Sequence, residues 1–124
     1  VLKFQKNLAY HPPKKYNGSI LDGRDITSKV VTDAEFKFYI TANTRVRAKR
    51  RYDELIKLGK KVKFDEILNS IKKRDREDRS SKHSKLKKTK DSILINTTNL
   101  SIKNSFLKVK KIMDRKLNEI WKKL

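Results

Sequence analysis

Residues 35–59 read EFKFYITANTRVRAKRRYDELIKLG, a stretch in which a predicted β-strand passes directly into a predicted α-helix. From Glu35 to Thr41, apolar side chains alternate with others, which is the two-residue period of a strand. Asn43 or Thr44 then supplies an N-cap, and the helix is predicted to end at Gly59. This step from strand to helix favours an α/β protein.

The elements on either side continue the alternation. Helices are predicted over 1–10, over about 64–79 and from Ser101 onward, and short strands over 19–21 and 92–96. The order indicates an α/β fold with a largely parallel sheet. Three strands are too few for a complete doubly wound domain, so we expect a partner segment to be absent. The last helix carries an apolar side formed by Ile102, Phe106, Val109, Met113, Leu117, Ile120 and Trp121.

Composition excludes several classes of protein. A chain of 124 residues is one domain or part of one. It has no Cys, which excludes disulfides and thiolate metal sites and makes a cytosolic setting the default expectation. No apolar run approaches the roughly 18 residues needed to span a bilayer. We expect His11 and His83 to face solvent, and no spacing of acidic or His residues predicts a metal site.

The net charge of +20 comes from 34 basic and 14 acidic residues and has two interpretations. One is a surface for nucleic acid or another polyanion. The Lys-rich stretches at Lys60-Lys61 and 85–90 keep a small basic nucleic-acid-binding protein open as the alternative function. The other is compositional drift, because the Lys residues are scattered over predicted exposed faces. We favour the second, and nucleic acid is not the expected partner.

Two short motifs combine Arg with Asp at the ends of predicted elements. Asp22-Gly23-Arg24-Asp25 follows the strand over 19–21, and 74–78 (RDRED) closes a helix. Arg presents a planar, permanently charged fork that matches phosphate oxygens in pairs. Asp accepts hydrogen bonds from sugar hydroxyls or from the exocyclic amine of a base. The motifs therefore predict a site for a phosphorylated nucleoside.

Structural interpretations of the same residues remain open. Asp22 would serve only to brace a strand end, and Arg24 with Asp25 would form a surface ion pair of little energetic value. Arg74 and Asp78, four residues apart, would form an ordinary helical ion pair. The arginine cluster that starts the second predicted helix would be a solvated face; it consists of Arg47, Arg50 and Arg51.

Five strings in order resemble the C-terminal half of the bacterial cytidylate kinases. They are residues 21–26 (LDGRDI), 33–42 (DAEFKFYITA), 47–52 (RAKRRY), 71–75 (IKKRD) and 91–97 (DSILINT). The resemblance implies a P-loop kinase-type parallel sheet with flanking helices and a helical lid. It also implies transfer of the ATP γ-phosphoryl group to CMP or dCMP. Residues 1–124 would then be the C-terminal part of one kinase domain, with core 1–43 and 91–124 and a lid over about 44–90.

The resemblance also assigns roles to the residues of the two motifs. Arg24 is expected to hold the CMP phosphate, and Asp25 to face the cytosine amine. Arg74 would be a lid arginine that reaches the phosphates when the lid closes. Asp78 would bond the ribose hydroxyls.

Further implied roles concern ATP, which this family uses with Mg²⁺. Arginines at the start of the lid would approach its phosphates, namely Arg47, Arg50 and Arg51. Asp22 and Lys82 are possible further site residues, apart from these ATP roles. Lys82 is included because Ser81 stands where the family usually has an arginine, and a Lys point charge does not reproduce a bidentate fork.

The largest departure from the family is the absence of a Gly-rich GxxxxGK[ST] loop, whose backbone amides cradle the ATP phosphates. We therefore expect the N-terminal part, with the P-loop and a CMP-binding insertion, to be missing, and the chain alone to be inactive. A third hypothesis is that the chain is an unstable remnant of such a kinase without a biochemical role. Other departures are Thr27 for a usual Gly, and Thr32 and Lys85 for usual Pro. Thr27 would be strained if its φ were positive.

Overall fold

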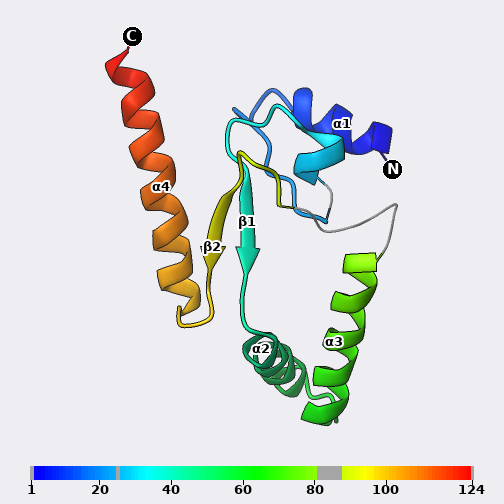
Figure 1. Cartoon of the computed structure of the whole chain (residues 1–124). Helices are drawn as coiled ribbons and strands as arrows, with labels where there is room; N and C mark the ends of the chain where they lie inside the picture. The colour runs from blue at the N-terminus through cyan, green and yellow to red at the C-terminus, as the bar shows by residue number, and fades with distance from the viewer. Residues whose placement is uncertain (1, 25, 81–87, 124) are drawn as a thin grey trace. The chain divides into compact units, whose positions relative to one another are not determined.

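The computed structural model describes residues 2–24, 26–80 and 88–123 (Figure 1). They divide into two compact units, one formed by 1–37 with 72–92 and the other by 38–71 with 93–124. None of the described helices combines the length and apolarity needed to cross a membrane. The elements in chain order are α1 (Leu2–Tyr10), a π-helical turn η1 (Ile26–Val30), β1 (Phe38–Thr41), α2 (Thr44–Lys57), α3 (Phe64–Ser80), β2 (Ile93–Asn96) and α4 (Ile102–Lys122).

The sheet lies in the second unit and consists of β1 and β2, which pair in parallel. Phe38 lies opposite Ile93, and Thr41 lies opposite Asn96. A small parallel sheet with flanking helices is what the sequence predicts. The first strand is shorter than the predicted 35–41, because the paired register with β2 covers only Phe38–Thr41 opposite Ile93–Asn96.

Helix α2 is defined at both ends by the predicted caps. At its start, the side chain of Asn43 accepts a hydrogen bond from a backbone N–H of the first turn. At its end, Gly59 has a φ of 76° and donates its N–H to Ile56 O at 2.9 Å, while Lys60 N donates to Leu55 O at 3.0 Å. These two bonds form the Schellman motif that terminates helices at a left-handed glycine.

Helices α3 and α4 also confirm their predictions, with Leu68 of α3 buried in the second unit. Helix α4 begins where Ser101 Oγ accepts from Asn104 N at 3.0 Å. No residue of α4 is buried among the described residues, and its apolar side is open, with Phe106 64% and Trp121 71% exposed. The helix itself was predictable, but its apolar side is only partly covered in the described part of the chain, where Val109 and Met113 are half-buried.

The first unit contains α1, the π-helical turn and the second half of α3. Its core is Ile26, Val30 and Val31, against which Ala9, Leu21 and Ala34 pack. The π-helical turn was not predicted; in it, Ile26 O accepts from Val31 N at 2.7 Å, the wider spacing of such a turn.

The predicted strand over 19–21 is wrong. These residues are not paired with any described strand, and Ile20 is 99% exposed. A strand needs a neighbour to satisfy its backbone groups, and the residues described here offer none at this position. Instead, Ser19 Oγ donates to Leu8 O at 2.7 Å and ties the segment to α1.

The concern about Thr27 is also resolved. It lies in the π-helical turn, and no described residue other than Gly59 has a positive φ. Threonine therefore occupies this position without backbone strain.

Candidate functional site

Arg24 and Asp78 meet in the first unit, although 54 residues separate them in the sequence. Arg24 Nε lies 3.2 Å from Asp78 Oδ1, and the two side chains are 35% and 17% exposed. The structure thus brings together two of the four residues predicted to bind CMP. Asp78 pairs with Arg24 rather than with Arg74, so the helical ion pair considered from the sequence is not the arrangement found among the described residues.

The other predicted CMP ligands are described only in part. Arg74 lies one helical turn before Asp78 on α3 and is exposed. Asp25, Ser81 and Lys82 lie outside the described residues. Asp22 is exposed, and the interpretation that it braces a strand end fails because none of the described residues before it forms a strand.

Asp22 also lines a hollow of about 340 Å³ in the first unit. The walls come from α1, from the proline turn after it and from the segment that leads to η1, with Leu8, Pro13, Leu21 and Ile26 among them. The hollow therefore sits directly beside the motif that carries Arg24.

Gly23 fixes the backbone of that motif against the core. A Cβ at this position would lie 2.9 Å from Ile26 Cγ1 and 3.1 Å from its Cδ1. Ile26 is 9% exposed and belongs to the core of the first unit. A Cβ here would force Ile26 or the backbone to shift, so glycine permits this close approach beside the core.

The arginines at the start of α2 are not a uniformly solvated face. Arg47 Nε donates to Ala42 O at 3.0 Å, and its Nη2 donates to Thr44 Oγ1 at 3.3 Å. Arg51 instead forms an ion pair with Glu54 at 3.1 Å, with both side chains more than half exposed. Both terminal nitrogens of Arg50 donate hydrogen bonds to the segment that follows β2.

Lys37 is a residue whose structural importance the sequence interpretation missed. Its side chain is 7% exposed, and its Nζ donates to Thr32 O and lies 2.6 Å from Asp91 Oδ2. The hydrogen bond from Lys37 holds the pKa of Asp91 below its usual value, with a smaller contribution from Thr89. Their pairing could have been predicted from the sequence, because Lys37 and Asp91 each precede one of two parallel strands. The starts of parallel strands lie at the same edge of a sheet.

Tyr10 provides a second polar link within the first unit. Its hydroxyl donates to Asp33 Oδ1 at 2.5 Å, joining the end of α1 to the segment after η1. This hydrogen bond to a carboxylate raises the pKa of Tyr10.

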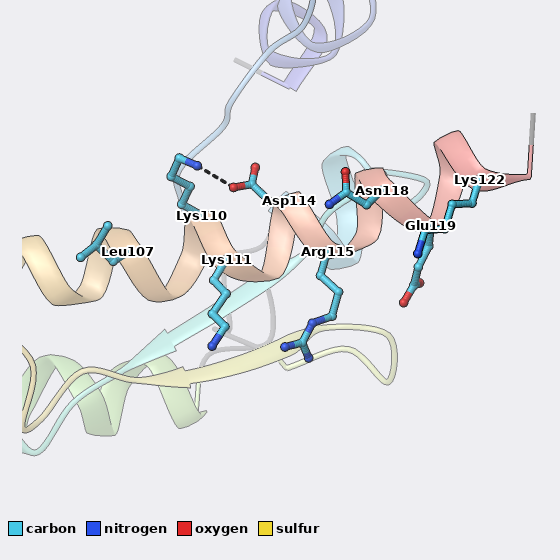
Figure 2. Close-up of a pocket in the computed structure, with 8 residues that line it drawn as sticks. All are labelled: Leu107, Lys110, Lys111, Asp114, Arg115, Asn118, Glu119 and Lys122. Atoms are coloured by element: carbon cyan, nitrogen blue, oxygen red, sulfur yellow. Dashed lines mark hydrogen bonds and ion pairs between the residues drawn. The ribbon is translucent and has the colours of Figure 1, made fainter.

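Neither a metal site nor a second ligand cleft emerges from the described residues. They contain no group of three or more His, Cys, Asp or Glu side chains able to hold a metal ion, and His11 is exposed as predicted. Figure 2 shows a larger hollow beside α4, but all eight residues that line it belong to that one helix. Lys110 and Asp114 pair with each other there at 2.5 Å. A hollow with one wall cannot enclose a ligand.

Comparison with known proteins identifies the family. The family model "Cytidylate kinase" matches residues 3–115. The cytidylate kinase of Bartonella tribocorum is 46% identical over 102 residues, covering 82% of this chain and 46% of the relative. Those of Clostridium botulinum and Thermosipho melanesiensis are 43% and 41% identical, covering 93% and 92% of this chain and 51% and 50% of the relatives. The chain spans about half the length of the curated relatives that it matches. It belongs to the cytidylate kinase family.

Proposed function

We propose that this chain supplies the acceptor-binding part and the lid of a nucleoside monophosphate kinase, which transfers the γ-phosphoryl group of ATP to CMP or dCMP. The observation that carries the proposal is the contact between Arg24 and Asp78, which come from the two Arg–Asp motifs of the sequence and lie within the residues that the family model matches. Membership in that family does not favour the alternative of a nucleic-acid-binding protein.

Arg24 is the residue that we assign to the phosphate of CMP. A guanidinium carries five N–H donors in a rigid fork, so the contact of Nε with Asp78 does not exhaust its capacity. Asp78 holds the fork in one orientation before the nucleotide arrives. Such pre-orientation lowers the entropy lost on binding.

The remaining assignments follow the family motifs. Asp78 would accept hydrogen bonds from the ribose hydroxyls, and Asp25 from the cytosine amine. Arg74, exposed on α3, would reach the phosphates as the lid over about 44–90 closes. The core of the kinase domain would comprise 1–43 and 91–124.

Phosphoryl transfer develops negative charge on the transferred oxygens, so positioned cations stabilise its transition state. Arg47 and Arg51 of α2 are the residues that we assign to the ATP phosphates. Mg²⁺ is not accommodated by the described residues, which lack a carboxylate cluster, and the sequence has no GxxxxGK[ST] loop. We therefore assign the ATP cradle and the metal to the half of the relatives that this chain does not span, and expect the chain alone to be inactive.

Calorimetric titration of the full chain with CMP tests the acceptor site. We expect saturable binding of CMP and dCMP, weaker binding of UMP, and loss of binding in Arg24→Ala. Arg24→Lys keeps a cation beside Asp78 but removes the fork, so it should also bind more weakly. Arg76→Ala removes an exposed arginine from the same helix as Asp78 and serves as the control. Equal CMP affinity in wild type and Arg24→Ala would refute the assignment.

A further inference from the structure

Both terminal nitrogens of the Arg50 side chain donate hydrogen bonds to a single segment of the chain. Nη1 donates to Thr97 Oγ1 at 3.0 Å, and Nη2 donates to Thr97 O at 2.5 Å and to Leu100 O at 3.1 Å. All three acceptors belong to the segment 97–100, which joins β2 to α4. A bidentate grip on phosphate normally uses these same terminal nitrogens.

The segment 97–100 is tied to the ends of both strands. Thr97 N donates to Thr41 O at 2.8 Å, continuing the ladder by one residue, and Leu100 N donates to Thr97 O at 3.1 Å. Asn43, the N-cap of α2, donates its backbone N–H to Thr98 Oγ1 at 2.8 Å. The segment therefore lies at the carboxyl ends of two parallel strands, the edge at which open α/β sheets bind ligands.

Thr97 is unusual within this segment because it is 7% exposed although polar. Its carbonyl oxygen accepts hydrogen bonds from Arg50 Nη2 and from the Leu100 N–H. Its hydroxyl also donates to Thr41 O at 3.3 Å. Arg50 thus supplies donors to a buried polar residue, where an unpaired group would be unfavourable. Arg50 itself is exposed, so water competes for its outer bonds and its effect is local.

We propose that Arg50 is a positioning residue: it fixes segment 97–100 at the carboxyl edge of the sheet and does not itself grip an ATP phosphate. This departs from the role that family resemblance gives to the arginine cluster. The positioning of the segment is independent of the proposed function. Only its consequence for a bound nucleotide rests on that function.

Amide hydrogen exchange measured by NMR on the full chain tests the positioning role. In Arg50→Ala, we expect the Leu100 amide to exchange at least about tenfold faster, the factor that corresponds to losing a charge-assisted hydrogen bond. Arg50→Lys should restore only part of the protection of the Leu100 amide, because one ammonium group cannot reach all three acceptors. Lys49→Ala removes the neighbouring cation, which pairs with exposed Asp53 and lies over the Tyr52 ring but does not contact segment 97–100 through any bond described above, and should leave Leu100 unchanged.

The Lys60 amide at the far end of α2 reports whether the helix itself has loosened. Two results would overturn the proposal. One is a Leu100 exchange rate in Arg50→Ala that stays within about twofold of the wild-type rate. The other is a Leu100 rate that rises no more than the Lys60 rate does in both Arg50→Ala and Arg50→Lys.

A second readout separates positioning from phosphate binding. MgATP is titrated into the wild-type chain while the arginine Nε–H resonances are followed. We expect the Arg50 resonance to stay in place. A saturable shift of that resonance, accompanied by loss of Leu100 protection, would mean that Arg50 leaves the segment for phosphate and would overturn the proposal. If no arginine responds to MgATP, the absence of the ATP cradle from this chain accounts for it, and the exchange result alone decides the role of Arg50.

Discussion

At the scale of single residues, Gly23 lets the backbone of the Arg24 motif lie close to the core because it has no side chain. A Cβ there would lie 2.9 Å from Ile26 Cγ1, a branched and buried side chain with little room to move. We expect Gly23→Ala to lower the free energy of unfolding by about 1–3 kcal/mol, as overpacking does, and to weaken CMP binding by displacing Arg24. Urea denaturation and calorimetry measure the two effects.

Gly18→Ala is the matched control for this substitution. Nothing lies within 4 Å of a Cβ at Gly18, which belongs to the same unit, so this change should leave stability and binding nearly unchanged. Equal behaviour of the two variants would show that close approach at Gly23 is unimportant.

The ion pair of Lys37 with Asp91 makes stability depend on pH in a defined direction. Because the pKa of Asp91 is lowered in the folded chain, its contribution is fully present above the unfolded pKa of about 3.9 and is lost as the pH falls through the folded value. We therefore expect Asp91→Asn to lower the urea midpoint at pH 7, and the difference from wild type to shrink progressively as the pH falls below the unfolded pKa of about 3.9. A difference that does not shrink on acidification would argue against the pairing.

At the scale of elements, α2 depends on a conformation that only glycine adopts easily. Gly59 has a φ of 76° with open space around it, so the cost of a side chain there is conformational rather than steric. We expect Gly59→Ala to destabilise the chain by about 1–2 kcal/mol, and Gly59→Asn by less, since Asn tolerates this region better. Urea denaturation ranks the variants, and an unchanged midpoint for Gly59→Ala would contradict the Schellman termination of α2.

The same scale explains what the sequence could and could not predict. The ends of α2 and α4 depend on local cap residues such as Asn43 and Ser101, so their positions were readable from the sequence. The segment over 19–21 has the apolar composition of a strand, but strand formation depends on a neighbour that is not local. The contact between Arg24 and Asp78 is likewise non-local. Family motifs pointed to both residues, while their pairing required the fold.

At the scale of the whole molecule, apolar surface remains open in the second unit. A two-stranded parallel sheet is unusual, because parallel sheets are normally covered on both faces. Here Ile40 and Leu94 of the sheet are each more than half exposed, as are Phe106 and Trp121 of α4. Since the chain spans about half of its relatives, we propose that the other half of a cytidylate kinase covers these side chains and supplies the ATP cradle.

This proposal predicts complementation in trans. Alone, the chain should leave CMP unphosphorylated. Mixed with a polypeptide corresponding to the half of the Clostridium botulinum relative that it does not span, it should melt at a higher temperature than alone and transfer phosphate from ATP to CMP. Trp121, the only tryptophan, should shift its emission to shorter wavelength as α4 is covered.

Arg24→Ala separates assembly from catalysis, because Arg24 lies in the first unit and outside the exposed apolar surface. The variant should keep the fluorescence shift and the raised melting temperature in the mixture but lose phosphorylation. CMP phosphorylation by the unmixed chain, or a melting temperature that the second polypeptide leaves unchanged, would show that the chain needs no other half. A mixture that shifts Trp121 without phosphorylating CMP would mean that the apolar surface assembles as proposed but that the acceptor site no longer works.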